Sequence, residues 1–380
     1  MKKYGIYIHF PYCVHKCSYC DFYSIENLNS RNKFTKLLTK EIEMKFAEFS
    51  DEILVDSIFI GGGTPSLMKP HHIEPVFKII RDNVTLTSDC EITMECNPGT
   101  IDVKFLTVYK ELGVNRISFG VQSFIEAELK FLERIHSKDD IAKSVKLARE
   151  VGFSNISIDL MFALPNQTPD NWYYNLNKAI ELETNHISAY SLIYEPGTPL
   201  YEDYKSGKIV PQNDESDSEL YFMTNEVLSK AGFMQYEVSN YAKSGSKCRH
   251  NLRYWSGDEY FGFGPSAHSY IGERRAWNYR SNDKYFQSLE NGNFPIEGFE
   301  DLSRNQMIFE KIYLGLRAEG INFDEFANFY KIDLFKCHRN YIEKLISEGF
   351  AELNSGILKL TNKGYFTGDN ITVKFASAIE

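Results

Sequence analysis

Short runs of apolar, β-branched and aromatic residues recur through the first half of the chain, each followed by a longer stretch with apolar residues at helical spacing. The short runs predict strands at residues 5–9, 57–60, 91–95, 116–119, 157–160 and 186–192. The stretches between them predict helices at 32–49, 73–82, 102–112, 125–135, 139–151 and 169–182. Such alternation is typical of a parallel sheet, and six units are two short of a closed barrel. We therefore expect an α/β fold with an open, partial (β/α)6 TIM-like barrel, with a doubly wound sheet as the alternative.

The pattern changes near residue 200, where the turn Pro196-Gly197-Thr198-Pro199 ends the alternation. Residues 210–218 are polar, and residues 241–270, rich in Gly and aromatic residues, are predicted to form a loop. Helices are predicted at 303–317, 322–330 and 334–348, followed by a hairpin of 351–353 and 357–360. Three helices followed by a hairpin is an order of elements similar to that of a winged-helix domain. We expect a barrel core at 1–200, a barrel-capping, aromatic-rich segment at 201–300 and a smaller α+β, winged-helix-like domain at 301–380.

Composition argues against several classes of function. The chain has 42 Lys and Arg against 52 Asp and Glu, which gives a net charge of −10. The segment from residue 301 has ten Lys and Arg against eleven Asp and Glu. Binding to nucleic acid depends on positive charge, so we expect no nucleic-acid partner and interpret the last domain as a packing or lid domain. No apolar run approaches the roughly 18 residues that cross a bilayer, so no membrane span is expected. Seven cysteines, an odd number, favour a reducing cytoplasm over a disulfide scaffold.

Three of these cysteines, Cys13, Cys17 and Cys20, form a Cys-x3-Cys-x2-Cys pattern directly after the first predicted strand. Three thiolates on one short loop can converge on one metal centre. A structural zinc ion needs a fourth protein ligand, and His15 lies inside the loop, where it is poorly placed. A [4Fe–4S] cluster has four irons, so three cysteines leave one iron open for a small molecule. We therefore favour the cluster over zinc and over three unrelated buried cysteines.

Glycine or polar residues occur at the carboxyl ends of the later predicted strands. They are Gly61-Gly62-Gly63-Thr64, Glu95, Gln122, Asp159 and Ser191. In βα barrels these strand ends meet at the face that holds the active site. Asp159 lies in an apolar run, and a buried carboxylate needs a partner. We therefore expect one shared ligand site at this face.

The segment Cys13-Val14-His15-Lys16-Cys17-Ser18-Tyr19-Cys20 resembles the signature of the radical S-adenosylmethionine (SAM) superfamily, with Tyr19 as the aromatic residue before the last cysteine. The resemblance implies that SAM binds the open iron, that one electron from the reduced cluster splits its S–C5′ bond, and that an electron donor serves the cluster. From Tyr4 to about Gly364 the chain is similar to the branch that contains oxygen-independent coproporphyrinogen III dehydrogenase.

Resemblance to that branch also implies a set of SAM contacts. Arg134 would pair with the SAM carboxylate, and Asp159 and Gln122 would hold the ribose hydroxyls. Without the resemblance, Arg134 would be interpreted as an exposed helix cation beside several glutamates. The full expected set is Tyr7, Tyr19, Gly62, Gly63, Thr64, Glu95, Gln122, Arg134, Asp159 and Ser191.

Two departures separate the chain from the coproporphyrinogen enzymes. Those enzymes have a further cysteine two residues after the third ligand, where this chain has Asp21-Phe22, and only residues 1–3 precede the first strand here. In contrast, His250-Asn251-Leu252-Arg253-Tyr254-Trp255 is similar to the His-Asn-x-x-Tyr-Trp motif of the HemW-type haem chaperones. The resemblance implies a protein that binds haem and passes it to an acceptor protein. Coproporphyrinogen III dehydrogenase activity is the alternative, and no catalytic residue is assigned.

Haem contact is expected at His250, Tyr254 and Trp255, because imidazole ligates haem iron and aromatic rings pack on a flat macrocycle. Cys248 and His268 are weaker candidates, and His9 is expected to be a core histidine. The alternative is a loop in which His250 bonds to backbone while the aromatic residues seal the barrel mouth. The sequence leaves open the identity of the acceptor, covalent attachment of haem and formation of a homodimer.

Overall fold

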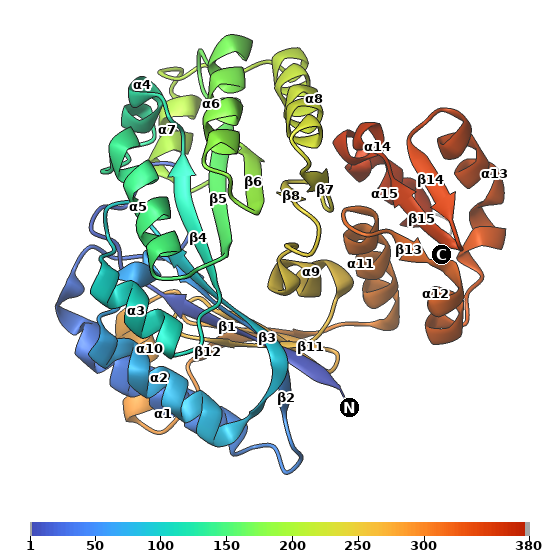
Figure 1. Ribbon diagram of the computed structural model, residues 1–380. Helices are drawn as coiled ribbons and strands as arrows, with labels where there is room; N and C mark the ends of the chain where they lie inside the picture. Colours follow the sequence, from blue (N-terminus) through green and yellow to red (C-terminus); the bar gives the residue numbers. More distant parts are fainter. Residues whose placement is uncertain (1, 377–380) are drawn as a thin grey trace.

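The computed structural model describes residues 2–376. Met1, at the start of the first expected domain, and residues 377–380, at the end of the third, lie outside the described residues. Six parallel strands form the centre of the fold (Figure 1). They are β1 (Lys3–Phe10), β2 (Leu54–Gly62), β3 (Thr85–Cys96), β4 (Arg116–Gln122), β5 (Asn155–Phe162) and β6 (His186–Ser191). All six predicted strands are confirmed, and β3 begins earlier than the pattern indicates.

Helices connect these strands and cover one face of the sheet. They are α1 (Arg31–Phe46), α2 (Pro70–Asn83), α3 (Val103–Glu111), α4 (Glu126–Phe131), α5 (Lys138–Glu150) and α6 (Pro169–Glu181), with short 3-10 turns at Leu28–Ser30 and Pro65–Leu67. The helix predicted at 125–135 is too long: α4 ends at Phe131, and Glu133 turns the chain with a φ of 52°.

Side chains alternate across the parallel strands, which gives the sheet two different faces. The outer face is apolar and buried under the helices, with Ile6, Ile8, Ile58, Ile60, Ile92, Met94, Ile117, Phe119, Ile156, Ile158 and Ile187. The residues between them face the interior of the barrel and are largely polar: Tyr7, His9, Ser57, Glu91, Glu95, Arg116, Ser118, Ser157, Asp159 and His186. Strands buried on both faces are usually apolar throughout, so this polar interior indicates a site for ligands.

Short strands extend the sheet at both edges, in the order β12-β11-β10-β9-β1-β2-β3-β4-β5-β6-β8-β7. Strand β9 pairs in parallel with β1, and β8 pairs antiparallel with β6. Their bounds are β7 (Met234–Gln235), β8 (Asn240–Ala242), β9 (Tyr260–Phe263), β10 (His268–Ile271), β11 (Arg274–Asn278) and β12 (Ile296–Asp301). Within the described residues this order is linear rather than closed, which confirms the open, partial barrel.

The predicted loop at 241–270 is wrong, because this segment contains β8, α9 (Arg249–Ser256), β9 and β10. These elements are too short to give a clear period. In β9, a Cβ on Gly262 would lie only 1.8 Å from the carbonyl oxygen of His268, so the glycine that suggests a loop is required by the close approach of β10.

The C-terminal part forms a small domain beside the barrel (Figure 1). The three predicted helices and the hairpin are confirmed as α11 (Arg304–Leu316), α12 (Phe323–Tyr330), α13 (Leu334–Ser347), β14 (Ala351–Asn354) and β15 (Ile357–Leu360). Strand β13 (Ile321–Asn322) joins the hairpin, and α14 (Asn362–Phe366) and α15 (Gly368–Ala376) follow it. Helix α11 contacts α9, and α14 contacts α8 (Asp214–Lys230). Two further helices are α7 (Pro199–Lys205) and α10 (Asn282–Glu290).

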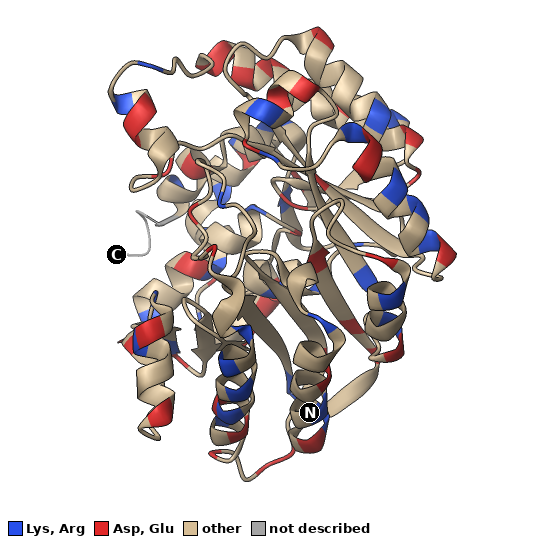
Figure 2. Cartoon of the chain, turned by 90° about the vertical axis from the view of Figure 1, so that its left-hand side faces the viewer, with Lys and Arg blue, Asp and Glu red and all other residues tan. Residues whose placement is uncertain are grey.

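The surface carries charges of both signs. On the face shown in Figure 2, Lys and Arg are interspersed with Asp and Glu along the outer helices. In the described part of the chain, no helix combines the length and the hydrophobicity that crossing a bilayer requires.

Candidate cluster and cofactor site

Cys13, Cys17 and Cys20 lie on the loop that follows β1, at the carboxyl edge of the sheet. All three thiols are free; Cys13 and Cys17 are buried, and Cys20 is partly exposed. The loop is held by backbone hydrogen bonds, from Cys13 N–H to the Ile25 carbonyl (3.0 Å) and from Cys20 N–H to the Cys17 carbonyl (3.1 Å). The fold therefore presents three thiols on one ordered loop at the open end of the barrel.

The surroundings of these thiols suit a cluster. The Thr64 hydroxyl lies 3.5 Å from Cys13 Sγ, and Nη1 of Arg134 lies 3.8 Å from Cys17 Sγ. Burial raises the pKa of Cys17, and it raises the pKa of Cys20 to about 11, so binding of a cationic centre would be coupled to proton release. Among the described residues, no three His, Cys, Asp or Glu side chains converge on a point that would hold a single metal ion. A cubane offers each cysteine a different iron, so this donor set fits a [4Fe–4S] cluster.

The glycines at the end of β2 allow close packing beneath the cysteine loop. Gly62 has a φ of +107°, and a Cβ there would lie 2.7 Å from the His9 ring. A Cβ on Gly63 would lie 2.6 Å from the carbonyl oxygen of Tyr12. The Thr64 N–H also donates to that carbonyl (2.8 Å), which brings the Thr64 hydroxyl to Cys13. Glycine is therefore required for Thr64 to reach the cysteine loop.

Two acidic side chains lie inside the barrel, Glu95 on β3 and Asp159 on β5. The Gly62 N–H donates to Glu95 Oε2 (3.2 Å), and the Ser118 hydroxyl donates to Asp159 Oδ1 (3.3 Å). Burial raises the pKa of Glu95 to about 8, with a further contribution from the charge of Asp159, and burial also raises the pKa of Asp159. A cationic ligand would favour the ionised form of both groups, so the pair can recognise a positively charged group such as an amine.

Gln122 ends β4, which lies between β3 and β5 in the sheet, and Arg134 lies near Gly120 of the same strand. Gln122 has a φ of 66°, in the left-handed region, where a non-glycine residue costs about 1 kcal/mol or more. Nη2 of Arg134 donates to Asn97 Oδ1 (2.6 Å) and to the Gly120 carbonyl (2.8 Å), while its Nε is buried without a partner. Arg134 follows α4 and is partly buried, so the alternative of an exposed helix cation is wrong. Its unpartnered Nε can receive an anion such as a carboxylate.

The expected residues do not all meet in one place. A hollow beside the cysteine loop is lined by Cys17, Thr64, Asn97 and Arg134 among others. Ser191 instead donates to Asp217 of α8 (3.1 Å), and Tyr19 packs against a small apolar cluster that includes Leu200. Sequence reasoning missed Asn97, whose Nδ2 donates to the Thr64 hydroxyl (3.1 Å), although its place directly after the end of β3 is a signal.

Tyr7 and His9 connect the barrel interior to the cysteine loop. Burial lowers the pKa of His9 to about 4, so its ring is neutral. The Tyr7 hydroxyl lies 3.0 Å from Nδ1 of His9, and Nε2 of His9 lies 2.7 Å from the Tyr23 carbonyl, to which it donates. His9 is therefore a core histidine, as the sequence predicts, and it fixes the chain just after Cys20.

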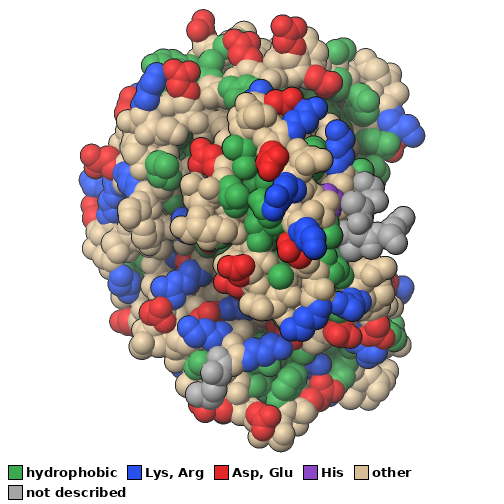
Figure 3. Space-filling view, turned by 90° about the vertical axis from the view of Figure 1, so that its right-hand side faces the viewer, with side chains coloured by type: hydrophobic (Ala, Val, Ile, Leu, Met, Phe, Trp, Pro, Cys, Tyr) green, Lys and Arg blue, Asp and Glu red, His purple; other side chains and the backbone are tan. Residues whose placement is uncertain are grey.

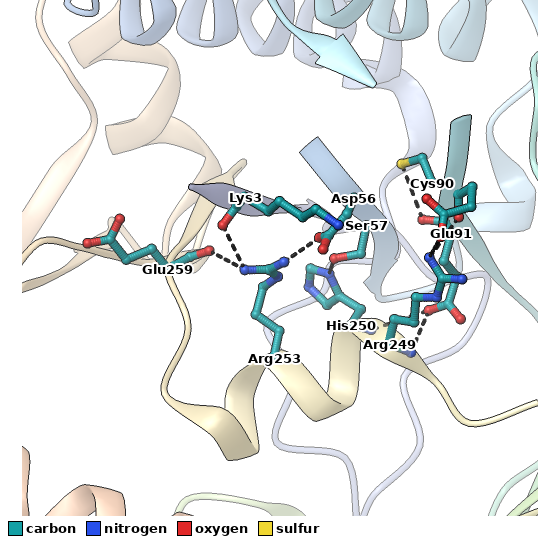
Figure 4. Close-up of polar contacts among 10 residues, drawn as sticks. Lys3, Asp56, Ser57, Cys90, Glu91, Arg249, His250, Arg253 and Glu259 are labelled. Carbon is teal, nitrogen blue, oxygen red and sulfur yellow. Dashed lines mark hydrogen bonds and ion pairs between the residues drawn. The ribbon is translucent and has the colours of Figure 1, made fainter. Parts of the chain in front are cut away.

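Helix α9 closes the amino-terminal end of the barrel (Figure 4). The His250 ring is fully buried and stacks on Phe59, with 5.4 Å between ring centroids. Its Nδ1 lies 3.0 Å from the Ser57 hydroxyl, and its Nε2 lies 2.9 Å from the Tyr254 hydroxyl. Burial lowers the pKa of His250 to about 3, so the imidazole is neutral. Both ring nitrogens have side-chain partners, and neither bonds to backbone.

Charged groups attach α9 to the barrel. Oε1 of Glu91 accepts the N–H groups of Arg249 (3.0 Å) and His250 (3.3 Å), so a β3 carboxylate caps the amino end of α9. Nη1 of Arg253 donates to the Lys3 carbonyl (3.2 Å), and its Nη2 forms an ion pair with Asp56 (Figure 4). These contacts make α9 a fixed plug.

The remaining candidates for haem contact lie apart from one another. Cys248 is buried, with its pKa raised to about 12 by burial, and its Sγ lies 3.5 Å from Oε1 of Glu91. His268 is exposed on β10 beside Trp277, with 5.9 Å between ring centroids. Trp255 is partly exposed on α9, and Tyr254 lines a groove that faces the C-terminal domain.

Comparison with known proteins identifies the family. Residues 7–177 match the model of the radical SAM superfamily, and residues 302–367 match the HemN C-terminal domain. A protein of Bacillus subtilis (strain 168) named Heme chaperone HemW is 35% identical over 369 residues, which are 96% of this chain and 97% of the relative. The chain belongs to the HemW family of radical SAM proteins. The HemW protein of Escherichia coli (strain K12) is 38% identical over 269 residues, 70% of each chain.

A solved structure shares the fold of this HemW family member. It is described as coproporphyrinogen III oxidase (HemN) from Escherichia coli, a radical SAM enzyme, and it superimposes with a TM-score of 0.84 at 23% identity. The match covers 99% of this chain and 90% of that one. The shared fold includes the partial barrel and the C-terminal domain. Radical SAM domains use SAM and a [4Fe–4S] cluster, and these are the cofactors of the family.

Proposed function

We propose that this chain is a haem chaperone that binds haem and passes it to an acceptor protein, and that Cys13, Cys17 and Cys20 hold one [4Fe–4S] cluster. The observation that carries this proposal is the similarity to proteins named Heme chaperone HemW, at 35% identity over 96% of the chain. The free cysteines and the reducing environment that they need support a cytoplasmic location. An electron donor and an acceptor protein complete the set of partners.

The residues around the hollow can hold SAM beside the cluster. Cys13, Cys17 and Cys20 would hold the cluster, whose chemistry when bound would be one-electron reduction of the SAM sulfonium. Arg134 offers its unpartnered Nε to the carboxylate, and Glu95 and Asp159 offer acidic groups to the amine and the ribose. The apolar outer face of the sheet and the α9 plug keep bulk water out of this interior. Tyr7, Gln122 and the Gly62–Gly63 turn complete the proposed contacts.

One position in the cysteine loop favours the chaperone over the porphyrinogen enzyme. Phe22 stands where the enzymes of the related branch are expected to carry a further cysteine, two residues after Cys20, and its ring is 65% exposed. A phenyl ring supplies no thiolate at this position. Coproporphyrinogen III dehydrogenase activity is therefore the second candidate.

An anaerobic assay distinguishes the two functions. The reconstituted protein is incubated with dithionite, SAM and coproporphyrinogen III, and a second sample is loaded with hemin and mixed with apomyoglobin. We expect the porphyrinogen to remain intact and haem to appear in myoglobin faster than from free hemin under the same conditions. Conversion to protoporphyrinogen, without transfer of haem, would establish the enzyme instead.

A further inference from the structure

A pocket lies beside α4, with a volume of about 610 Å³, which is within the size range of sites for small organic ligands. Its lining comes mainly from α4, from the loop after β5 and from residues 208–210, between α7 and α8. None of its lining residues lines the hollow beside the cysteine loop or the groove that faces the C-terminal domain. The pocket is therefore a further concave surface, which the proposed function does not use.

A buried carboxylate lines this pocket. Glu128 is 8% exposed, and its Oε2 accepts hydrogen bonds from the Ser123 hydroxyl (2.5 Å) and from Nδ2 of Asn175 (2.8 Å). The ammonium of Lys208, which also lines the pocket, pairs with Asp203 (2.6 Å), and Glu128 has no ion-pair partner in the described part of the chain. Buried charges are normally paired, so Glu128 can accept a cation from outside the chain.

A second acceptor in the pocket lacks a hydrogen bond. Gln167 is 5% exposed, and its Nε2 donates to Oε1 of Glu128 (3.0 Å). Because the carboxylate engages the amide NH2 group, the free atom of this side chain is its oxygen, and Oε1 of Gln167 is buried without a partner. A buried acceptor without a donor is unfavourable. The two side chains therefore place acceptor capacity at the pocket that the donor group of a ligand can satisfy.

The walls of the pocket are apolar. Phe131, Leu164 and Ile209 belong to a small hydrophobic cluster, and Val210 is 76% exposed. On the face that carries the C-terminal domain, by contrast, hydrophobic side chains lie among acidic and basic ones (Figure 3). A hydrocarbon group in the pocket would remove the Val210 side chain from water. The pocket therefore fits a ligand with an apolar body and a cationic donor at one end.

We propose that this pocket binds a primary ammonium group carried on a hydrocarbon body. The ammonium donates to Oε1 of Glu128 and to Oε1 of Gln167, and the hydrocarbon packs against Phe131 and Val210. This inference goes beyond the proposed function and does not depend on haem. The same chemistry can come from a free alkylamine or from a lysine side chain of a partner protein, so the test includes both sources.

Isothermal titration calorimetry measures the binding of two amine probes to the full, anaerobically reconstituted chain. 2-Phenylethylamine represents a free amine, and the peptide acetyl-Leu-Lys-Leu-amide represents a lysine side chain. Their neutral counterparts are 2-phenylethanol and acetyl-Leu-Gln-Leu-amide. Because hydrogen bonds between charged groups are stronger than neutral ones, we expect at least one amine probe to bind at least tenfold more tightly than its counterpart.

Two variants test whether the amine lies in the pocket. Glu128→Gln removes the charge, and Gln167 can then turn its amide so that the two side chains keep a hydrogen bond. Val210→Ser removes apolar surface at an exposed position, where the change leaves the fold intact. The matched controls are Glu41→Gln, at a buried, hydrogen-bonded carboxylate of α1, and Val373→Ser, at a 62% exposed position of α15.

We expect amine affinity to fall at least tenfold in Glu128→Gln, to fall about two- to fivefold in Val210→Ser and to stay within twofold in both controls, with thermal unfolding as the check of folding. Tighter binding of phenylethylamine than of the peptide would identify a small amine as the ligand, and the reverse would identify a lysine side chain. Failure of both probes to bind, or equal affinity of the wild type and Glu128→Gln, would overturn the site. Neither result bears on the haem proposal, because the experiment contains no hemin.

Discussion

The Tyr254 hydroxyl lies 2.9 Å from Nε2 of His250, and this contact joins the groove at the C-terminal domain to the interior of the barrel. On its other side the His250 ring stacks near Tyr7, with 6.5 Å between centroids, and the Tyr7 hydroxyl reaches His9. His9 in turn holds the Tyr23 carbonyl, three residues after Cys20. A continuous series of rings and hydrogen bonds therefore runs from the groove to the cysteine loop.

The first prediction concerns His250. His250→Ala leaves a cavity and removes the partners of Ser57 and Tyr254, so we expect a loss of about 2–4 kcal/mol in the free energy of unfolding. Tyr254→Phe removes only one hydrogen bond and should cost about 1–2 kcal/mol. Urea denaturation of the haem-free protein measures both. If His250→Ala unfolds with the same midpoint urea concentration as the wild type, His250 does not hold α9 in place.

The second prediction concerns Glu95 and pH. Burial raises its pKa from 4.5 to about 8 in the folded chain, so the folded state favours the protonated carboxyl. Its contribution to stability is therefore unchanged below about pH 4.5 and becomes steadily less favourable as pH rises to about 8. Glu95→Gln, which cannot ionise, should raise the melting temperature of the SAM-free protein more at pH 8 than at pH 5. If Glu95→Gln changes the melting temperature by the same amount at pH 5 and at pH 8, Glu95 is ionised at both pH values.

The third prediction concerns the strained backbone at Gln122. Gln122→Gly relieves a left-handed residue, so we expect the SAM-free protein to gain up to about 1 kcal/mol of stability. The same change removes the side chain and should weaken SAM binding, measured by calorimetry on the reconstituted protein. Ala163→Gly is the matched control, because Ala163 also has a positive φ (58°) and follows β5. SAM affinity reduced equally by both changes would remove Gln122 from the proposed contacts.

The fourth prediction concerns the thiol of Cys17. Cys17→Ser removes one of three ligands, so the visible absorbance of the iron–sulfur cluster should be lost while the circular dichroism of the barrel is retained. Cys337→Ser, at an exposed position on α13, is the control and should keep the cluster. Iron and sulfide analysis gives the second readout. Full retention of iron in Cys17→Ser would exclude Cys17 as a ligand.

The sequence predicts the barrel well because local patterning determines it. In β5, Asp159 lies between Ile158 and Leu160, and this alternation places the apolar pair under the helices and the acid in the interior. The cysteine loop is equally local, since its ligands lie within eight residues of one another. Local patterns of this kind carry both the fold and the expected cluster.

Contacts between distant segments could not be predicted in the same way. The helical plug depends on Ser57 and Glu91, which lie 193 and 159 residues from His250 in the sequence. Strand β9 is stabilised as a partner of β1, at the other end of the barrel sequence. The groove requires α9 and the C-terminal domain to face each other, which no local pattern encodes.

The most direct test of the central claim is electron paramagnetic resonance of the anaerobically reconstituted, dithionite-reduced protein with and without SAM. A cluster on Cys13, Cys17 and Cys20 with one open iron should give the signal of a reduced [4Fe–4S] centre, and that signal should change shape when SAM is added. Protein that contains zinc in place of iron, or a cluster signal that SAM leaves unaltered, would contradict the account.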